Sequence, residues 1–234
     1  MRAWIGKLRG LSPQSRHNYR GRLANLFGYA VKNNYVDSNP VKGIELERLV
    51  GAPPEIFRPD QLRMLLENAN SDVVPLLAIG AFAGLRSAEL LRLEWKDLER
   101  GSVRVEAAKA KSARRRVIKM SPNLAAWLAP YQGREGRLWT RSENEYHWTA
   151  CQAMRLAGLS KWPHNGLRHS FASYHLAQQD APRLALDMGH VSPHLIFAHY
   201  REIVSEEEAE RYWTIFPPVP AVPAANVVRI AQAC

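Results

Sequence analysis

The stretch SDVVPLLAIGAFAGLRSAELLRLEW, residues 71–95, largely decides the fold expected for this 234-residue chain. Its first fourteen residues predict an apolar helix that ends at Gly84, since glycine is common immediately after a helix. A second helix with leucines on its packing side is expected to begin close to Ser87. The cation of Arg86 therefore falls between two apolar helices, where a charge is costly unless an anion meets it.

A second segment, HNGLRHSFASYHL at 164–176, also places polar side chains inside an apolar helical pattern. Arg168 lies next to the apolar stripe of this predicted helix, as Arg86 lies next to its own. Two such arginines favour a phosphate ligand. The alternative for a single arginine is a structural ion pair, for example between Arg86 and Glu89 one turn later.

Basic charge is concentrated in two parts of the chain, whose formal net charge is +10. Residues 1–50 hold nine Lys/Arg against three Asp/Glu, and residues 104–119 hold seven against one. Clustered cations gain affinity for a polyanion by releasing counterions from its phosphates. Two separate basic segments indicate a groove that grips DNA from two sides, and the alternative is a pair of solvated runs that keep the protein soluble.

The amino-terminal part is expected to hold one amphipathic helix and then a linker. Apolar residues recur at helical spacing between residues 12 and 33, which predicts one helix with an inward apolar face and outward arginines. Residues 41–55 contain glycine and paired prolines, which interrupt a helix, so they are interpreted as a linker. The inward residues are Leu23, Leu26, Phe27, Ala30 and Val31, and the outward ones are Arg16, Arg20 and Arg22.

The rest of the chain predicts a mostly α protein with a small antiparallel sheet, an α+β fold. Pro59 suits the first turn of a helix, and alternating residues from Val103 to Val117 predict a β-hairpin with a very basic tip. Four prolines within seven residues mark the last stretch, 216–234, as a tail. Further helices are expected at 122–131, 143–157, 165–179, 181–188 and 193–212.

Several classes of protein are excluded by the sequence. No apolar run approaches the roughly 20 residues of a membrane span, and the amino terminus has no secretory core, so a cytoplasmic protein is expected. Cys151 and Cys234 fit neither a zinc spacing nor a disulfide framework. The histidines between 164 and 200 lack an HExxH arrangement and the usual carboxylate or thiolate partners, so no metal and no cofactor are predicted.

Four short motifs together resemble the tyrosine recombinases, the phage integrase family. They are AGLRSAELLRLEW at 83–95, HNGLRHSFAS at 164–173, MGH at 188–190 and HYRE at 199–202. They occur in the family's order, and the basic hairpin lies between the first two, where the family keeps a lysine. The resemblance covers roughly residues 10 to 212.

The resemblance implies a site-specific DNA recombinase that cuts and rejoins strands through a 3′-phosphotyrosine link, without metal or ATP. Arg86 and Arg168 would bind the non-bridging phosphate oxygens, and His190 would donate to one of them. Lys109 would protonate the leaving 5′-oxygen. Lys111 is the alternative, because a one-residue shift of the hairpin register exchanges the two lysines.

The same resemblance makes Tyr200 the nucleophile, with two departures from the family pattern. The family spacing would place the nucleophile one residue earlier, and a longer loop accounts for the difference. His164 precedes Arg168 by four residues instead of three, yet on a helix both offsets fall on one face, so it keeps a role as base or phosphate donor. Of the other tyrosines, Tyr174 belongs to an apolar stripe and Tyr212 follows an acidic run that would repel phosphate.

The expected partner is double-stranded DNA, bound by a homotetramer on paired sites, and the protein is expected to be a monomer or weak oligomer without DNA. The last three arginines of the hairpin tip either hold the DNA backbone or face solvent. The predicted DNA-binding residues are Arg16, Arg20, Lys111, Arg114, Arg115 and Arg116.

Three parts are expected along the chain. Residues 1–50 resemble a partial helical core-binding domain with a linker to about 55, residues 56–215 a catalytic domain, and residues 216–234 a proline-rich tail. Because this clamp is shorter than the family's, weak DNA affinity with a steep salt dependence is predicted. The rival hypotheses are a catalytically decayed DNA-binding relative and a type IB topoisomerase-like enzyme that relaxes DNA.

Overall fold

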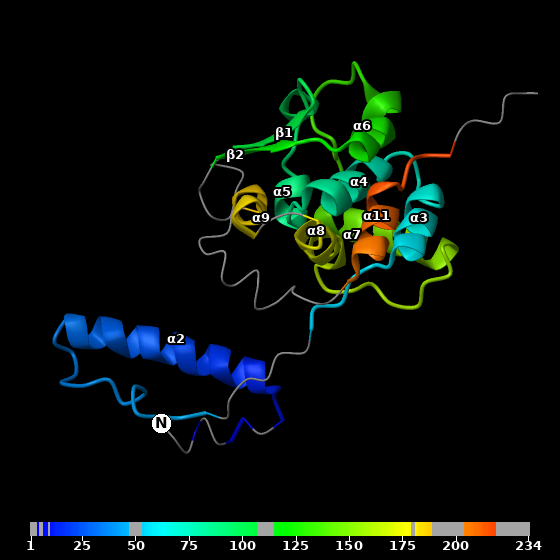
Figure 1. Ribbon diagram of the computed structural model, residues 1–234. Helices are drawn as coiled ribbons and strands as arrows, with labels where there is room; N and C mark the ends of the chain where they lie inside the picture. Colours follow the sequence, from blue (N-terminus) through cyan, green and yellow to red (C-terminus); the bar gives the residue numbers. More distant parts are fainter. Residues whose placement is uncertain are drawn as a thin grey trace, which may run out of the picture. The chain divides into compact units, whose positions relative to one another are not determined.

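A computed structural model describes residues 4, 7–8, 10–46, 53–106, 115–178, 181–188 and 204–218. The chain divides into two compact units, Met1–Ala52 and Pro53–Cys234. Helices form most of the secondary structure, and the second unit adds one two-stranded sheet (Figure 1). The prediction of a mostly α protein with a small antiparallel sheet is therefore confirmed. Among the described residues, no helix is long and apolar enough to cross a membrane.

The first unit is built on helix α2 (Pro13–Lys32), close to the predicted bounds. The Oγ of Ser12 accepts a hydrogen bond from the N–H of Ser15 at 3.2 Å, and a proline occupies the first turn. A polar cap and an early proline are typical of a helix start. The small apolar cluster of this unit comprises Val41 and Ile44 with Leu23, Ala24, Phe27 and Leu46 against them.

Two expectations for the first unit are wrong. Leu26 is 60% exposed, because α2 packs only along the narrow stripe that faces the apolar cluster. The linker does not begin at Val41, which is fully buried. The segment that follows α2 instead folds back on it, and the Nε of Arg20 donates to the carbonyl of Ile44 at 2.6 Å.

Helix α4 (Val74–Ala83) forms the centre of the second unit, and all ten of its residues are buried. It packs against α8 (Gly166–Leu176) and α6 (Pro122–Leu128), as a helix that is apolar on every side must. Gly84 ends α4 with φ of 66°, and a Cβ there would lie 2.3 Å from Cδ1 of Phe171. Glycine is therefore required both by the left-handed backbone and by the close approach of α8.

The other described helices of the second unit also agree with the predicted positions, except the last, which begins later than expected. Pro59 starts the first of them, as expected from its place in the sequence. They are α3 (Pro59–Glu67), α5 (Ser87–Leu90), α7 (Glu143–Leu156), α9 (Ala181–Met188) and α11 (Glu206–Trp213), with 3-10 turns η1 (Trp95–Asp97) and η3 (Ala129–Tyr131).

Strands β1 (Ser102–Val105) and β2 (Arg116–Lys119) pair in antiparallel register, which confirms the predicted hairpin. Val105 lies opposite Arg116, and both side chains are on the buried face together with Ile118. Because side chains alternate along a strand, the register fixes which basic residues of the hairpin face inward. An arginine thus occupies a core position of β2.

The helix expected over 193–212 is not continuous. Ser205 has extended backbone, with φ of −83° and ψ of 163°, and its Oγ accepts a hydrogen bond from the N–H of Glu208 at 3.2 Å. The side chain of Glu208 accepts in return from the Ser205 N–H, which completes a capping box. This Ser-x-x-Glu pattern starts α11 anew at Glu206. Residues 189–203 lie outside the described part of the chain.

Candidate active site

Arg86 lies at the junction between α4 and α5, where the sequence predicted an isolated cation. Its backbone N–H donates to Oε2 of Glu89 at 2.9 Å, and its Nη1 lies 3.4 Å from Oε1 of the same carboxylate. The predicted alternative partner is therefore present. The Arg86 side chain nevertheless keeps 28% of its surface exposed, so its guanidinium can also face a bound anion.

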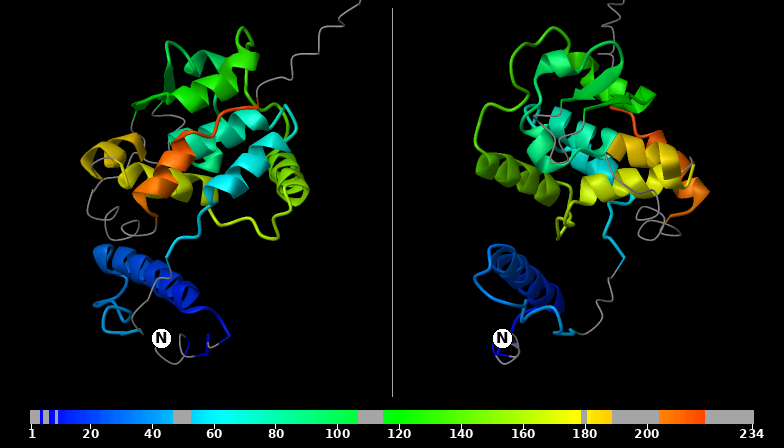
Figure 2. Two further views of the ribbon diagram at one scale, coloured as in Figure 1. Left: turned by 45° about the vertical axis from the view of Figure 1, so that its right-hand side comes forward. Right: turned by 90° about the vertical axis from the view of Figure 1, so that its left-hand side faces the viewer.

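Arg168, on the first turn of α8, is 6% exposed. One Nη donates to the carbonyl of Gly84, and the other donates to the carbonyl of Met188 at 2.8 Å. Both carbonyls lie at the carboxyl ends of helices, where the helix dipole stabilises a cation. Since α9 lies beside α8 (Figure 2), this one side chain connects the end of α9 to the loop that carries Arg86.

A pocket of about 290 Å³ lies between the start of α5, helix α7 and residues 162–168, and both His164 and Arg168 are among its lining residues. His164 is exposed and lies in the turn before α8, and Asn165 after it has the left-handed φ of 52°. The expectation that a helix brings His164 and Arg168 onto one face is therefore wrong. A turn gives the two side chains the same pocket instead.

Three aromatic or imidazole side chains of this pocket were not predicted from the sequence. They are Tyr146 and His147 on α7 and Trp162 before α8. Tyr146 is buried, and burial raises the pKa of its phenol, so this tyrosine stays protonated and contributes an apolar wall. No motif near these residues signals the pocket, because α7 reaches it only through the tertiary packing.

Arg116 was expected to hold the DNA backbone or to face solvent, and the structure contradicts both expectations. It is only 8% exposed, and its two Nη atoms donate to the carboxylate oxygens of Glu89 at 2.7 and 3.1 Å. Its Nε donates to the carbonyl of Asp187 at 2.9 Å. The physical reason is the hairpin register, which puts position 116 on the same face as Ile118.

The carboxylate of Glu89 is ionised in this surrounding. Burial by itself raises the pKa of a carboxyl group, but the hydrogen bonds from Arg116 and from the Arg86 N–H outweigh it and lower the pKa of Glu89. A buried anion with two cations is thus part of the site.

The two other tyrosines considered as nucleophiles are both fully buried. Tyr174 stacks on Tyr212 with ring centroids 4.1 Å apart, and their hydroxyls donate to the carbonyls of Phe57 and Ala81. Burial raises the pKa of Tyr174 to about 12 and that of Tyr212 well above its ordinary value. The core position predicted for Tyr174 is confirmed, and Tyr212 is unreactive because it is buried, a stronger reason than the acidic run before it.

Several predicted site residues lie outside the described part of the chain. They are the nucleophile Tyr200, the phosphate donor His190, the two candidate proton donors Lys109 and Lys111, and Arg114. Their assignments stay predictions.

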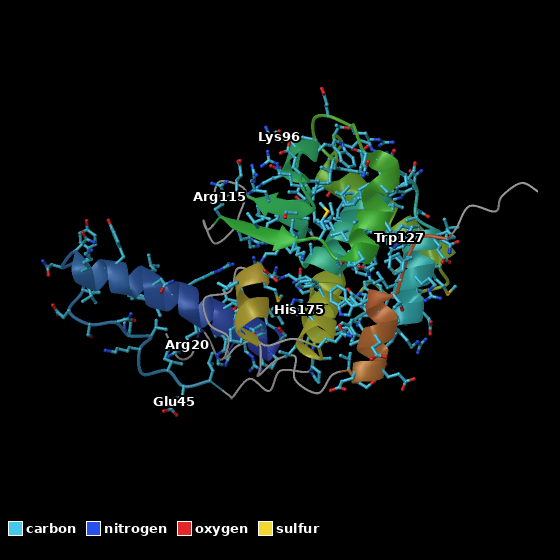
Figure 3. All side chains as sticks on the ribbon, turned by 45° about the horizontal axis from the view of Figure 1, so that its top comes forward. Arg20, Glu45, Lys96, Arg115, Trp127 and His175 are labelled. Carbon is cyan, nitrogen blue, oxygen red and sulfur yellow. The ribbon has the colours of Figure 1, made fainter. Side chains whose placement is uncertain are left out.

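The remaining predicted DNA-binding arginines differ in how much they expose. Arg115 is exposed beside the start of β2 (Figure 3). Arg16 and Arg20 on α2 are half-buried. Because the Nε of Arg20 donates to the Ile44 carbonyl, this side chain does not simply point outward as expected. Arg22 is the exposed arginine of the three on α2.

Comparison with known proteins finds one family and one fold. The model of the phage integrase family matches residues 55–207. A curated tyrosine recombinase of Pseudothermotoga lettingae is 27% identical over 181 residues, which cover 72% of this chain and 63% of that protein.

Two solved structures of lambda integrase have a similar fold. A dimer bound to a COC′ core site has a TM-score of 0.68 and 16% identity, and the match covers 86% of this chain and 79% of that one. A tetramer bound to a Holliday junction has a TM-score of 0.63 and 17% identity, over 80% of this chain and 62% of that one. At this identity the likeness concerns the fold.

Proposed function

The chain belongs to the phage integrase family, and from this we propose that it is a site-specific DNA recombinase whose nucleophile is Tyr200. The observation that carries the proposal is the contact between Arg168 and the loop that carries Arg86, which are far apart in the sequence. Arg168 donates to the carbonyl of Gly84, two residues before Arg86, and His164 lines the same pocket as Arg168. A pocket with these groups suits a phosphodiester.

In the proposed reaction, Oη of Tyr200 attacks the scissile phosphorus while the bond to the 5′-oxygen breaks. His164 takes the phenol proton, and Lys109, or Lys111 in its place, gives a proton to the departing 5′-oxygen. The product is a 3′-phosphotyrosine link and a free 5′-hydroxyl. Attack of a 5′-hydroxyl from a second strand reverses the step, so the energy of the phosphodiester is conserved and no ATP is consumed.

Negative charge accumulates on the non-bridging oxygens in the transition state, and the arginines meet it there. Arg168 is buried, so its charge acts in a medium of low polarity, and its carbonyl contacts fix the plane of the guanidinium before the DNA arrives. Arg86 and His190 supply the further donors.

We propose double-stranded DNA as the partner, gripped from two sides by the basic segments at 1–50 and 104–119. Recombination joins two duplexes that are each cut on both strands, so it calls for four protomers, as in the lambda integrase tetramer bound to a Holliday junction. Without DNA the protein is a monomer or a weak oligomer, and it works in the cytoplasm, where the DNA is.

The proposal is tested by covalent capture from a DNA pool, since the target sequence is unknown. The protein is incubated with nicked duplexes of randomised sequence, in which cleavage releases a short fragment from the 3′ side of the scissile phosphate. This fragment carries the free 5′-hydroxyl away, so the cleavage cannot reverse and the adduct is trapped. Complexes that survive a denaturing detergent are recovered, amplified and captured again. We expect the wild-type protein to select a DNA sequence and to form an adduct with it, and Tyr200→Phe to form none.

Tyr212→Phe is the matched control, because it removes the hydroxyl of another tyrosine that lies in the core. This variant keeps adduct formation and loses only about 1 kcal/mol of stability with one buried hydrogen bond. An adduct that persists in Tyr200→Phe would contradict the proposal, as would a wild-type protein that captures nothing from the pool.

A further inference from the structure

The carboxylate of Glu89 is shared by two arginines that come from distant parts of the sequence. It is 1% exposed, and it accepts hydrogen bonds from the backbone and side chain of Arg86 and from both Nη atoms of Arg116. A carboxylate offers about four lone-pair directions, and these contacts engage four. A movement of Arg116 therefore shifts the group that orients Arg86.

Arg116 is also the described residue of β2 closest to the basic tip of the hairpin. The tip at 107–114 carries Lys109 and Lys111, and Arg116 follows it by two residues. The opposite strand ends at Val105, the register partner of Arg116. The ion pair with Glu89 consequently holds the hairpin against α5 at the base of its tip.

The third contact of Arg116 reaches the end of α9. Its Nε donates to the carbonyl of Asp187, and Arg168 donates to the next carbonyl, that of Met188. Two arginines thus hold successive carbonyls at the carboxyl end of α9, immediately before the segment that contains His190.

We propose that Arg116 is a positioning residue, which sets the mutual placement of the phosphate-binding Arg86, the base of the hairpin that carries the proton donor, and the end of α9 that precedes His190. This inference rests on the proposed function. The role does not require Arg116 to touch DNA, because Arg116 is buried and acts through Glu89 and the end of α9.

Stability alone gives no reason for this ion pair. The free energy needed to remove two charges from water offsets the free energy of their attraction. A protein with apolar residues of similar volume in such a place is therefore often equally stable. A planar guanidinium has another property, since its five N–H donors lie in fixed directions and can hold a carboxylate and a carbonyl at once. A lysine ammonium is a point charge on a flexible stem and cannot fix all three groups.

Misplacement of catalytic groups by about 1 Å costs on the order of 100-fold in rate. We therefore expect Arg116→Lys and Arg116→Met to lower the single-turnover rate of adduct formation by about 10- to 100-fold at saturating DNA, with less than about a threefold change in Kd. Arg63→Met is the matched control, because it removes an exposed arginine of α3 that belongs to neither basic segment. It leaves the single-turnover rate unchanged.

A substrate with sulfur in place of the bridging 5′-oxygen separates positioning from a merely structural role. A thiolate leaves without a proton, so the defect of Arg116→Met should shrink about tenfold on this DNA if the variant misplaces the proton donor. An equal defect on both substrates would overturn the coupling between Arg116 and the hairpin donor.

The double variant Arg116→Met/Glu89→Leu distinguishes positioning from loss of fold. We expect its melting temperature to return close to that of the wild type, since the unpaired buried charge is gone, while its cleavage rate stays as low as that of Arg116→Met. A rate that recovers together with the melting temperature would overturn the proposal.

Amide hydrogen exchange gives a readout that needs no catalysis. Arg116→Met is expected to speed exchange of the Arg86 N–H, which donates to Glu89, by about tenfold or more, and Arg63→Met leaves it unchanged. If the wild type captures no DNA, the proposed function fails, and the exchange result alone tests whether Arg116 is coupled to Arg86 through Glu89. Unchanged protection of the Arg86 N–H in Arg116→Met would overturn it.

Discussion

Two buried regions of the second unit are built from opposite kinds of contact. Between α4, α8 and α11 the contacts are aromatic. The ring centroids of Phe82 and Tyr212 lie 5.4 Å apart, and Tyr174 stacks on Tyr212. Around Glu89 they are ionic, since a buried carboxylate meets two guanidinium groups.

The difference separates stability from placement. Buried apolar surface contributes roughly 25 cal/mol per Å² wherever it packs, so the aromatic region stabilises the fold without strict demands on direction. The ionic region gains little net free energy, because desolvation offsets attraction, but its hydrogen bonds have fixed directions. Damage to the first region should unfold the protein, whereas removal of the whole ion pair from the second should slow its chemistry and leave it folded.

The largest expected effect on stability is that of Phe82→Ala. This ring is fully buried between α4 and α11, and its removal leaves a cavity, so the free energy of unfolding should fall by about 3–5 kcal/mol. Urea denaturation measures the change. A loss below about 1 kcal/mol would contradict the view that α4 lies at the centre of the stabilising core.

Glu89→Leu is expected to follow, with a loss of about 3 kcal/mol. The variant leaves the guanidinium of Arg116 buried without its carboxylate, which is far more costly than absence of the whole pair. Adding Arg116→Met should therefore recover most of the loss in the same denaturation experiment. If the double variant is less stable than Glu89→Leu, the ionic region contributes to stability as the aromatic one does. That result would contradict the proposed difference between the two regions.

A smaller effect is expected from alkaline pH in the aromatic region. Burial raises the pKa of Tyr174 from the ordinary 10 to about 12, so the folded protein keeps a proton that the unfolded chain releases. This stabilisation is complete below pH 10 and is lost as the pH rises from 10 to 12. Melting temperatures across that range should fall more steeply in the wild type than in Tyr174→Phe, and equal slopes would contradict the assignment.

The smallest effect is expected at the surface, from Asp60→Asn. Its partner Arg211 donates to both carboxylate oxygens at 2.7 and 2.8 Å, yet both side chains are exposed. Exposed pairs contribute about 0.5 kcal/mol, and less at high salt. A loss above about 2 kcal/mol, measured by urea denaturation, would show that an ion pair need not be buried to matter in this fold.

The same contrast explains what the sequence could predict. Helix α4 and the start of α3 follow from apolar periodicity, Gly84 and Pro59, which are local signals. The hairpin was predicted too, but not the inward side chain of Arg116, because charge suggests a surface and only the register assigns the face. Counting alternate residues back from the apolar Ile118 was the available signal.

Other differences came from packing between distant segments. The glycine and prolines that follow Val41 predict a linker from this residue on, yet Val41 is buried against α2. For the candidate site, the family motifs predicted that Arg86 and Arg168 serve one site. The structure shows Arg168 in contact with the loop that carries Arg86, and tertiary packing adds a pocket wall from α7. His164 reaches that pocket by a turn, which no helical spacing could predict.

The central claim, that Tyr200 forms a covalent link to DNA, is tested most directly by locating the link. The captured adduct is digested with nuclease and protease, and the peptide that retains a nucleotide is sequenced by mass spectrometry. The predicted result is one peptide with a 3′-phosphonucleotide on the phenolic oxygen of Tyr200. A nucleotide attached to any other residue would contradict the account.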